Sequence, residues 1–381
     1  MKILLINYEY PPIGGGAANA TFFLAKALRR AGHSPVVVTA AFGNMPAYST
    51  ENAVEIYRLP VRRKKAEGSN PLEMISFARI ARRESVAIAR KHSIEAVIVF
   101  FTLPCGPVAR RLKRVLNLPY IVSLRGGDVP GLVPNLKFYH RLLCFWRRRI
   151  LADAKAIVAN DQGLARLSEA ADPYPVHVVP NGVDCDYFVP LSSPSSPQSK
   201  RPFRWLFAGR LHVQKNLALL FSEFAALNKI GSGAGKLMIV GDGPIAKDLH
   251  TYAKELGIAG LITWLGWIQR DEVLSAYQSA DAILNPSQYE GLPNVVLEAM
   301  ACSRPVIASD IPGNNTLVLH EQTGLLFQLD DPHSLRKAMA RFLLDPALVE
   351  KLGSAARIRV QREYSWDRVA QRYLELFQSG N

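Results

Sequence analysis

Short, nearly continuous runs of apolar residues alternate along the chain with longer segments in which apolar residues recur roughly every three or four positions. The runs are typical of parallel strands covered on both faces, and the longer segments are typical of helices packed on a sheet. The predicted strands are residues 2–7, 36–40, 54–59, 96–101, 120–124, 156–159, 176–179, 205–208, 237–240, 262–265, 282–284, 306–308 and 325–327. This order predicts an α/β fold with doubly wound parallel sheets.

The alternation is interrupted at residues 192–202, where Ser and Pro dominate. Such a composition predicts an interdomain linker or an exposed loop. The strand–helix order then starts again, and a length of 381 residues is typical of two domains. We therefore expect a first Rossmann-like domain over residues 1–185 and a second over residues 186–363.

Composition narrows the class of protein. Hydrophobic residues make up 49% of the chain and charged residues 20%, which is ordinary for a globular protein. The four cysteines show no CxxC spacing and suit a reducing compartment better than a disulfide framework. The first apolar run is too short for a signal peptide, and the longest, residues 96–104, is too short to span a bilayer. We expect a cytoplasmic chain without a transmembrane anchor.

Positive charge is concentrated in the first half. Residues 1–190 contain 26 Lys and Arg against 14 Asp and Glu, whereas the remainder contains 20 against 18. A basic half beside a nearly neutral half implies an anionic partner for the first domain. Nucleic acid is not the expected partner, because aromatic residues are not interleaved with the basic ones.

The segment from residue 285 to residue 302 carries two candidate acidic residues. Glu290 lies in a predicted loop after a strand, and Glu298 lies in the first turns of the helix that follows Pro293. On one continuous helix the two would be offset by about 80°, and the break between loop and helix lets both face one site. The alternative is that Glu298 only complements the helix dipole and Glu290 is solvated.

Two candidate cations follow the first strand of the second domain. Arg210 comes directly after that strand, and Lys215 is predicted at the N-terminus of the next helix, an unfavourable position for a cation unless an anion lies there too. Two fixed cations beside a helix end suit a diphosphate that gains charge as it leaves. The alternative is two solvated cations.

Glycines mark two loops of the first domain. Gly14, Gly15 and Gly16 lie between a strand and a helix, an arrangement that presents backbone amides to an anion, although a flexible turn is the alternative. A second loop contains Arg125 and Asp128. Arginine cannot act as a general base, so Arg125 is expected to hold a phosphate or a sugar hydroxyl, with Asp128 orienting it or binding the acceptor. A structural Asp–Arg pair is the alternative.

No metal or other cofactor is expected. The chain has no Asp-x-Asp after a predicted strand, and its eight histidines show no paired spacing. Asp330 and Asp331 are predicted to cap a helix.

Two motifs carry a family resemblance. Glu290-x7-Glu298 within EGLPNVVLEAM, its flanks SQYEGLPN and EAMACSRPVIAS, and the segment GRLHVQKN resemble retaining, nucleotide-sugar-dependent glycosyltransferases of the GT-B fold, in the "glycosyl transferases group 1" (family 4-like) superfamily. The resemblance implies two Rossmann-like domains facing across a cleft. Residues 1–185 would bind the acceptor and residues 186–363 the nucleotide sugar. The last helix, within residues 364–381, would pack back on the first domain.

The resemblance also implies a role for each candidate residue. Glu298 would hold the ribose, Glu290 the donor sugar, and Arg210 with Lys215 the donor pyrophosphate. The remaining positions implied to face the donor, mostly through backbone groups, are Gly14, Gly15, Gly16, Ile268, Gly291, Leu292, Asn294 and Val295. Many relatives have His where this chain has Arg125, so the catalytic part played by that loop stays open.

The expected function is a retaining hexosyltransferase acting from a nucleoside-diphosphate sugar, with UDP expected over GDP. The acceptor would be a hydroxyl of a glycan or lipid-linked molecule, in cell-surface polysaccharide or glycolipid biosynthesis. The enzyme would be peripheral on the anionic cytosolic membrane face, through residues 62–65 and the basic side chains of Arg79, Arg82, Arg83, Arg110, Arg111, Lys113 and Arg114. The alternatives are a GT-B nucleotide-sugar 2-epimerase and a non-enzymatic protein that binds anionic surfaces.

Overall fold

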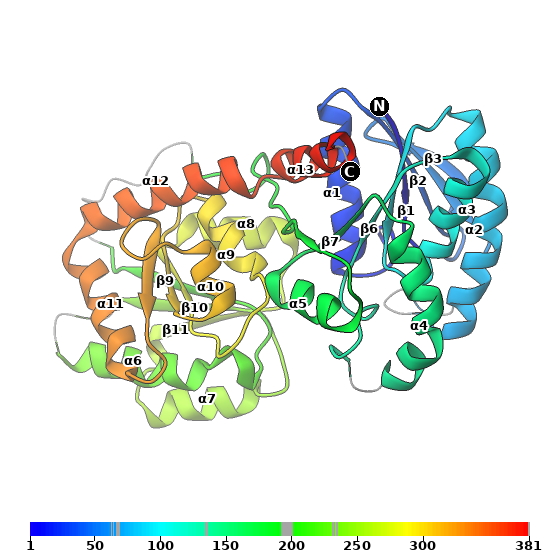
Figure 1. The fold of residues 1–381 in the computed structure, drawn as a ribbon. Coiled ribbons are helices and arrows are strands. Elements are labelled where there is room, and N and C mark those ends of the chain that lie inside the picture. Colours follow the sequence, from blue (N-terminus) through cyan, green and yellow to red (C-terminus); the bar gives the residue numbers. More distant parts are fainter. Residues whose placement is uncertain are drawn as a thin grey trace. The chain divides into compact units, whose positions relative to one another are not determined.

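The computed structural model describes residues 1–381 except 62, 64, 66–68, 134–135, 192–200, 231–232, 234 and 380–381. Most of the predicted linker and two residues of the basic 62–65 loop, Arg62 and Lys64, therefore lie outside the described residues. The chain forms two compact units, one of Met1–Gly182 with Trp366–Asn381 and one of Val183–Ser365 (Figure 1). Each unit is a mainly parallel sheet covered by helices, which confirms the predicted pair of Rossmann-like domains.

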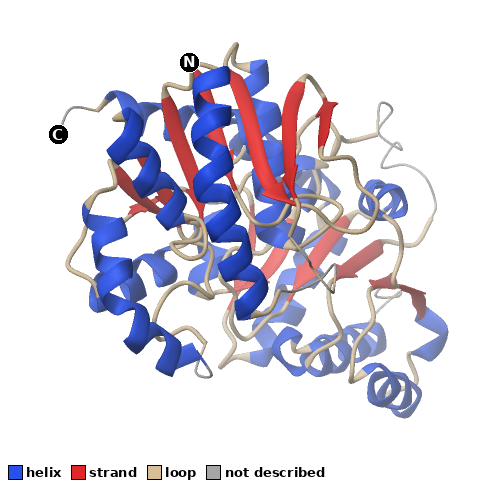
Figure 2. Cartoon of the chain, turned by 90° about the vertical axis from the view of Figure 1, so that its right-hand side faces the viewer, coloured by secondary structure: helices blue, strands red, loops and turns tan. Residues whose placement is uncertain are grey.

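The sheet of the first unit is parallel except at one edge, where β3 pairs antiparallel with β4. Helices lie on both sides of its strands (Figure 2). In spatial order its described strands are β3 (Tyr48–Glu51), β4 (Val54–Leu59), β2 (Ser34–Ala40), β1 (Lys2–Ile6), β5 (Ala96–Phe100), β6 (Tyr120–Ser123), β7 (Ala156–Ala159) and β8 (His177–Val178). The sequence pattern missed β3, because this short edge strand has no buried residue.

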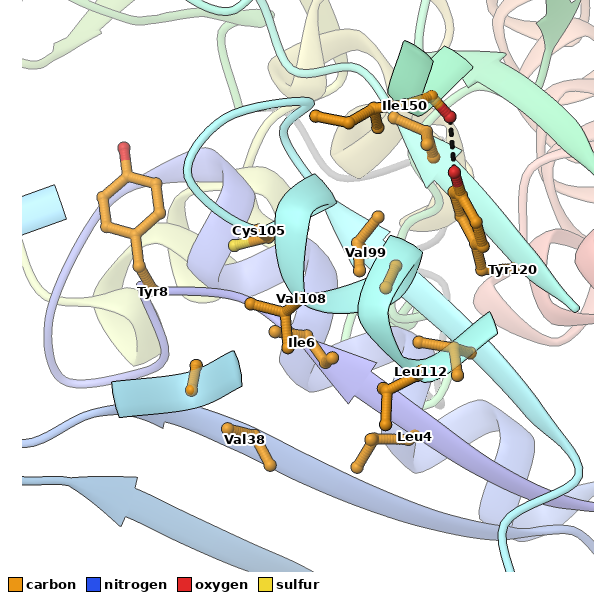
Figure 3. Packing of buried hydrophobic residues seen from close by; sticks show 14 of the residues in the cluster. Leu4, Ile6, Tyr8, Val38, Val99, Cys105, Val108, Leu112, Tyr120 and Ile150 are labelled. Carbon is orange, nitrogen blue, oxygen red and sulfur yellow. Dashed lines mark hydrogen bonds between the residues drawn. The ribbon is translucent and has the colours of Figure 1, made fainter. Parts of the chain in front are cut away.

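The helices of this unit cover two separate cores. Ile3 and Leu5 of β1 pack against α1 (Gly16–Arg30) and α13 (Trp366–Gln378) on one face. Leu4 and Ile6 point to the other face (Figure 3). The helices on that face are α2 (Pro71–Lys91), α3 (Gly106–Leu116), α4 (Lys137–Ala152) and α5 (Gln162–Ala171). Burial on both faces explains why the strands read as unbroken apolar runs.

Local signals set the helix boundaries. At the start of α2 the Asn70 side chain accepts from the Glu73 amide at 3.0 Å, and the Glu73 carboxylate accepts from the Asn70 amide at 3.1 Å. This reciprocal capping box satisfies two amides that the helix leaves unpaired. At the end of α3, Asn117 adopts a left-handed conformation with φ of 55°, which lets the chain turn back toward the sheet.

The second unit has the strand order of a doubly wound dinucleotide-binding sheet. Its described strands, in spatial order, are β11 (Ile262–Gly266), β10 (Lys236–Val240), β9 (Arg204–Ala208), β12 (Ala282–Asn285), β13 (Val306–Ser309) and β14 (Gly324–Phe327). Its helices are α6 (Leu217–Ile230), α7 (Ala246–Glu255), α8 (Arg270–Ser279), α9 (Asn294–Ala301), α10 (Pro312–Leu317), α11 (Pro332–Leu344) and α12 (Pro346–Glu363), with 3-10 turns η2 (Val213–Lys215) and η3 (Ala259–Leu261). The order reverses between β9 and β12, and ligands of such sheets bind at the carboxyl ends of the strands at this point.

The second unit is inserted into the first. Its two ends meet at a bridge between Val183 and Ser365, where the Val183 amide donates to the Tyr364 carbonyl at 2.8 Å. The chain then returns as α13, whose Trp366 stacks on Phe23 of α1 with ring centroids 5.5 Å apart. Of the helices that the structure describes, none combines the length and apolarity needed to span a bilayer.

Candidate active site

The parallel sheet of the second unit brings three predicted residues to one edge. β9 and β12 are neighbouring parallel strands at the reversal of strand order. Arg210 follows β9, and Lys215 ends the 3-10 turn η2, just before α6 rather than within it. Glu290 lies in the loop after β12. Adjacent parallel strands end at the same edge, so residues far apart in sequence meet there.

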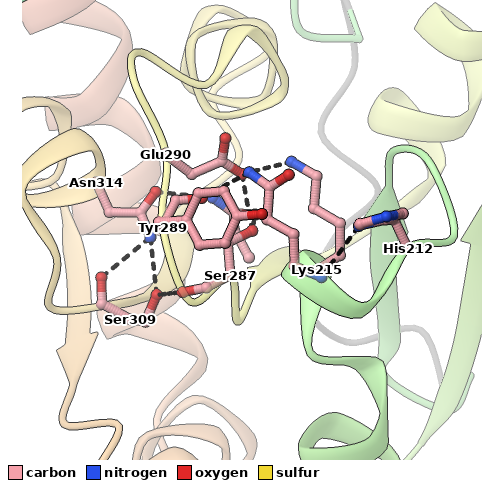
Figure 4. Close-up of polar contacts among 9 residues, drawn as sticks. His212, Lys215, Ser287, Tyr289, Glu290, Ser309 and Asn314 are labelled. Atoms are coloured by element: carbon pink, nitrogen blue, oxygen red, sulfur yellow. Dashed lines mark hydrogen bonds and ion pairs between the residues drawn. The ribbon is translucent and has the colours of Figure 1, made fainter. Parts of the chain in front are cut away.

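Lys215 and Glu290 form a direct ion pair. The Lys215 ammonium contacts Oε1 of Glu290, and the Ser287 hydroxyl donates to the same oxygen at 2.7 Å (Figure 4). The two charged side chains are only 15% and 10% exposed. Removing one partner from so buried a pair leaves the other charge uncompensated, which is costly. The site therefore contains a neutralised cation–carboxylate pair rather than two independently solvated charges.

Gln214 joins the two loops that carry this pair. Its side-chain amide donates to the Tyr289 carbonyl at 2.7 Å, and its own carbonyl accepts from the Gln288 amide at 2.9 Å. The His212 ring accepts from the Gln214 amide at 3.3 Å and caps η2. These contacts fix the position of Lys215 relative to Glu290.

A network of buried polar side chains holds Ser287 in position. Asn285 donates to the side chain of Asn314 at 2.8 Å, and Asn314 donates to the Ser309 carbonyl at 3.0 Å. The Ser309 hydroxyl in turn donates to the Ser287 carbonyl at 2.5 Å. None of these residues was predicted as part of the site, although a signal existed. Asn285 and Ser309 are the last residues of the neighbouring strands β12 and β13, whose ends meet at one edge.

Arg210 lies on a loop fixed by glycines. A Cβ at Gly241 would lie 1.9 Å from the Gly209 carbonyl oxygen, and one at Gly243 would lie 2.2 Å from the Leu211 carbonyl oxygen. These glycines therefore allow two protein loops to touch. The Arg210 side chain is exposed, and within the described part of the chain it has no hydrogen-bond or ion-pair partner.

Glu298 lies on α9 in a partly buried position. The hydroxyl of Tyr277, from α8, donates to its Oε2 at 2.9 Å. Burial raises the pKa of the Glu298 carboxyl to about 7, against the opposing effects of the Tyr277 hydrogen bond and the charge of Arg270. Arg270 is held by stacking 4.1 Å over the Tyr187 ring. This carboxyl therefore changes its charge near neutral pH.

The other predicted donor-side residues lie around α9. Ile268, Leu292 and Val295 pack, partly buried, against the apolar cluster that contains Tyr277. Gly291 is exposed, and Asn294 is the first residue of α9 and is also exposed. Pro293 precedes the helix rather than opening it. No side chain caps this helix start within the described residues.

The glycine loop of the first unit leads into α1. Gly14 has φ of +89°, and a Cβ there would lie 2.7 Å from the Glu9 side chain. Around Gly15 and Gly16 a Cβ would meet nothing within 4 Å, and α1 begins at Gly16 without a side-chain cap among the described residues. Gly14 is thus needed for packing, whereas the next two leave the helix amides open.

Asp128 holds the turn that contains Arg125. Its Oδ1 accepts from the amides of Arg125 at 3.0 Å and Gly126 at 3.1 Å, and its Oδ2 accepts from the Thr102 amide at 2.7 Å. Asp128 therefore orients Arg125 through the backbone, not through the guanidinium.

The Arg125 guanidinium is engaged elsewhere in the same unit. It donates to Asn181 at 2.6 Å and to Tyr373 of α13 at 3.4 Å, and it lies 4.8 Å over the Phe100 ring. Its Nε is buried without a hydrogen-bond partner among the described residues. Burial lowers the pKa of Arg125.

The structure thus groups the candidates unit by unit. Arg210, Lys215, Glu290 and the residues around α9 lie in the second unit, and the glycine loop, Arg125 and Asp128 lie at the carboxyl edge of the first sheet. Among the described residues, no group of three His, Cys, Asp or Glu side chains is arranged to hold a metal ion.

Family models match both units. The model described as "Glycosyl transferases group 1" matches residues 190–359, and the one described as "Glycosyltransferase Family 4" matches residues 14–187. The chain is a group 1 glycosyltransferase of the GT-B type. This confirms the resemblance inferred from the two motifs and the prediction that the chain is a glycosyltransferase enzyme.

Relatives of this glycosyltransferase span its length. An uncharacterized glycosyltransferase of Methanocaldococcus jannaschii is 26% identical over 99% of this chain and 98% of its own. A UDP-Gal:alpha-D-GlcNAc-diphosphoundecaprenol alpha-1,3-galactosyltransferase of Escherichia coli is 28% identical over 72% of this chain and 71% of its own. The crystal structure of Anabaena HepE in complex with UDP matches the fold with a TM-score of 0.70 at 18% identity, over the whole of both chains.

Gly313→Ala is expected to damage the candidate active site locally. A Cβ at Gly313 would lie 2.6 Å from the carbonyl oxygens of Glu290 and Gly291, so the Glu290 loop must move. We expect a loss of about 1–3 kcal/mol in the free energy of unfolding, with lower activity. Thermal unfolding and initial rates measure both effects.

Gly260→Ala is the matched control for this change. Its Cβ would meet nothing within 4 Å. If both variants had the stability and activity of the wild type, the close packing of Gly313 against the Glu290 loop would not be needed for either.

Proposed function

We propose that this glycosyltransferase moves a sugar from a nucleoside-diphosphate sugar, with UDP preferred, to a hydroxyl of a glycan or lipid-linked acceptor, with retention of the anomeric configuration. The observation that carries the proposal is the Lys215–Glu290 ion pair at the carboxyl ends of β9 and β12. In this pair Lys215 is a cation that could stabilise a leaving diphosphate, and Glu290 is a carboxylate that could accept hydrogen bonds from sugar hydroxyls. Arg210, exposed on the same strand end, adds a second cation.

The proposed chemistry forms one glycosidic bond and breaks one bond to phosphate. The acceptor oxygen bonds to the anomeric carbon on the face from which the diphosphate leaves. The acceptor proton passes to the departing phosphate oxygen. Charge grows on the diphosphate as its bond breaks, and Arg210 and Lys215 would stabilise that charge more in the transition state than in the ground state. No metal is proposed, because these side chains supply the positive charge.

Glu298 would hold the ribose hydroxyls of the donor. When ionised, its carboxylate is a charged hydrogen-bond acceptor on α9, and the Tyr277 hydroxyl, at 2.9 Å, fixes its orientation. Ile268, in the loop after β11, would face the base. UDP is favoured as the nucleotide because the Escherichia coli relative is named for a UDP-sugar and the Anabaena structure contains UDP.

The proposed acceptor is membrane-linked, and the enzyme would act as a peripheral protein on the cytosolic membrane face. The Escherichia coli relative is named for a diphosphoundecaprenol acceptor. On the helices of the first unit, Arg110 and Lys113 are bound to Asp153, at 2.5 Å each. The predicted basic side chains that remain exposed are Arg79, Arg82, Arg83, Arg111 and Arg114 on the helices, with Lys65 in the 62–65 loop. Each adds about 1 kcal/mol of attraction near an anionic surface. Arg63 of that loop is buried and donates to the Tyr8 carbonyl, so it is not available to an anionic surface.

A donor screen tests the function. Each UDP-sugar and GDP-sugar is incubated with and without a polyprenyl-diphosphate-linked acceptor, and release of the nucleoside diphosphate is measured. We expect one donor to give acceptor-dependent release and a product whose anomeric proton shows the donor's configuration. An inverted product would refute retention. A 2-epimer formed without acceptor would support the epimerase instead.

A chelator tests the metal-free reaction. EDTA added to the same assay is expected to leave the rate essentially unchanged, since Arg210 and Lys215 take the charge of the leaving group. Complete loss of activity that Mg²⁺ restores would contradict this part of the proposal. The apparent affinity for the donor is measured in parallel, because a metal bound only with the donor would change it.

A further inference from the structure

The outer face of α4 is apolar and exposed. Phe138 is 71% exposed, Leu142 67% and Phe145 55%. Their spacing of four and three residues places them along one side of the helix. Trp146, 53% exposed, and Tyr139, 47% exposed, lie beside this row. Five large apolar or aromatic side chains on one short helix form a patch of the kind that marks an interaction site rather than scattered exposure.

The inner face of the same helix is firmly anchored in the first unit. Ile150 is buried in the core, and its carbonyl accepts from the Tyr120 hydroxyl at 2.5 Å (Figure 3). Arg147 is also buried and donates to Asp172 at 2.5 Å and to Ser168 at 3.0 Å. The exposed face is therefore a fixed surface of the protein and not the side of a detached segment.

Charge on and beside α4 identifies the partner. The helix contains no Asp or Glu, and it exposes Arg141, Arg148 and Arg149. The Arg149 guanidinium lies 3.8 Å over the Phe145 ring, so cation and apolar surface are in contact. The nearby carboxylate of Asp172 is already paired with Arg147 and Arg148. A second copy of this chain would bring like charges together, whereas an anionic bilayer would not.

We propose that the outer face of α4 is a membrane-interfacial surface that inserts its aromatic and aliphatic side chains among the headgroups of an anionic bilayer. A helix with an apolar face flanked by arginines lies in the plane of such an interface. Aromatic side chains favour the headgroup level, and arginine heads remain at the phosphates. This surface supplies the apolar part of attachment that the exposed basic residues of α2 and α3 cannot supply.

The helix also connects the membrane surface to the candidate acceptor side. The buried Arg147 donates to the carbonyl of Asp128, in the turn that carries Arg125. A Cβ at Gly127 of that turn would lie 4.0 Å from Leu136, just before α4. Helix α4 therefore would contact the bilayer with its outer side, and it contacts the turn that carries Arg125 with its inner side. The inference rests on the proposed function for its meaning, since a lipid-linked acceptor would enter beside such a helix.

Vesicle binding by the full chain tests the surface. Co-sedimentation is measured with phosphatidylcholine vesicles and with vesicles that also contain phosphatidylglycerol. We expect binding to the anionic vesicles that weakens with salt. The triple variant Phe138→Ser, Leu142→Ser and Phe145→Ser should bind about 100-fold more weakly, because each of the three side chains, on partial insertion among the headgroups, would contribute a factor of about five. The matched control is Leu344→Ser with Ile358→Ser, two residues of the second unit that are 86% and 63% exposed, and it should bind like the wild type.

Insertion depth gives an independent readout. Brominated lipid should quench tryptophan fluorescence in the wild type, and the quenching should be lost in Trp146→Phe. Wild-type binding that the triple variant retains, or absence of binding to anionic vesicles, would overturn the proposal. Self-association that the triple variant abolishes, without vesicle binding, would assign the patch to a second copy instead.

Nucleotide binding separates the two proposals. UDP binding by calorimetry uses the second unit and should be unchanged in the triple variant. Vesicle binding without any binding of nucleoside diphosphates would support the membrane-interfacial role of α4 and would refute the proposed donor.

Discussion

Lys215→Ala is expected to lower kcat by about 100- to 1,000-fold, the range found when one preorganised donor to a developing negative charge is removed. The Michaelis constant should change much less, because the charge on the diphosphate grows between ground state and transition state. Arg210→Ala should show the same division between kcat and KM. Steady-state rates over a range of donor concentrations measure it. Losses confined to KM would mean uniform binding and would contradict the leaving-group role.

The two cations should differ in their effect on stability. Lys215 neutralises Glu290, whose side chain is only 10% exposed, so its removal leaves a mostly buried carboxylate with the Ser287 hydroxyl. We expect Lys215→Ala to destabilise the fold, whereas Arg210→Ala, on an exposed side chain, should not. Lys229→Ala, at the exposed far end of α6, is the matched control for loss of a lysine. Adding Glu290→Gln to Lys215→Ala should recover stability without recovering kcat.

Donor affinity is expected to rise about tenfold between pH 6 and pH 8 through Glu298. The pKa of this carboxyl is raised to about 7 by burial, so at pH 6 most of the free enzyme carries the neutral acid. If the carboxylate accepts the ribose hydroxyls, the acid must lose its proton before or during binding. Calorimetric titration with the UDP-sugar checks this, because its diphosphate diester does not titrate in this range.

Glu298→Gln provides the control for this pH dependence. Its affinity should be lower by roughly 1.5–3 kcal/mol at pH 8, the range for hydrogen bonds to charged groups, and should not vary between pH 6 and pH 8. Equal pH profiles for the variant and the wild type would contradict the ribose role of Glu298. Unchanged affinity in the folded variant would do the same.

The raised pKa of Glu298 also predicts the direction in which the free energy of unfolding changes with pH. A raised pKa means that the folded state holds the proton more tightly than the unfolded chain, whose carboxyl titrates near 4.5. The free energy of unfolding therefore falls as the pH rises from about 4.5 to about 7. Above pH 7 the loss is on the order of 3–4 kcal/mol, at about 1.4 kcal/mol per pKa unit. Glu298→Gln should remove this loss, and would then be more stable but a weaker binder at pH 8.

Strands were predictable because burial on both faces imposes a simple pattern. The run at residues 96–101 was predicted as a strand without any knowledge of its neighbours, and the structure places β5 at Ala96–Phe100. Helix boundaries were also local, set by signals such as Pro71 after Asn70. β3 was not predicted because an edge strand without a fully buried residue carries no such signal.

The candidate active site was only partly predictable from local sequence patterns. Both members of the Lys215–Glu290 pair could be named from motifs, yet their direct contact depends on β9 lying next to β12, which no local spacing encodes. The hydrogen bond from Tyr277 to Glu298 and the contact of Arg125 with Tyr373 likewise depend on tertiary packing, here of helices α8, α9 and α13. Spacing identifies loops, whereas strand order decides which loops meet.

The return of α13 to the first unit has a consequence for biosynthesis. Trp366, Val369 and Tyr373 belong to the apolar core on the α1 side of the first sheet, and they leave the ribosome after residues 1–365. Residues 183–365 are complete by then and can close their own core first. The nascent first unit must therefore wait with one face of its sheet and α1 uncovered, a state in which a chaperone would recognise it. A protease that cuts after Ser365 would spare the second unit and would destabilise the first unit, which loses α13.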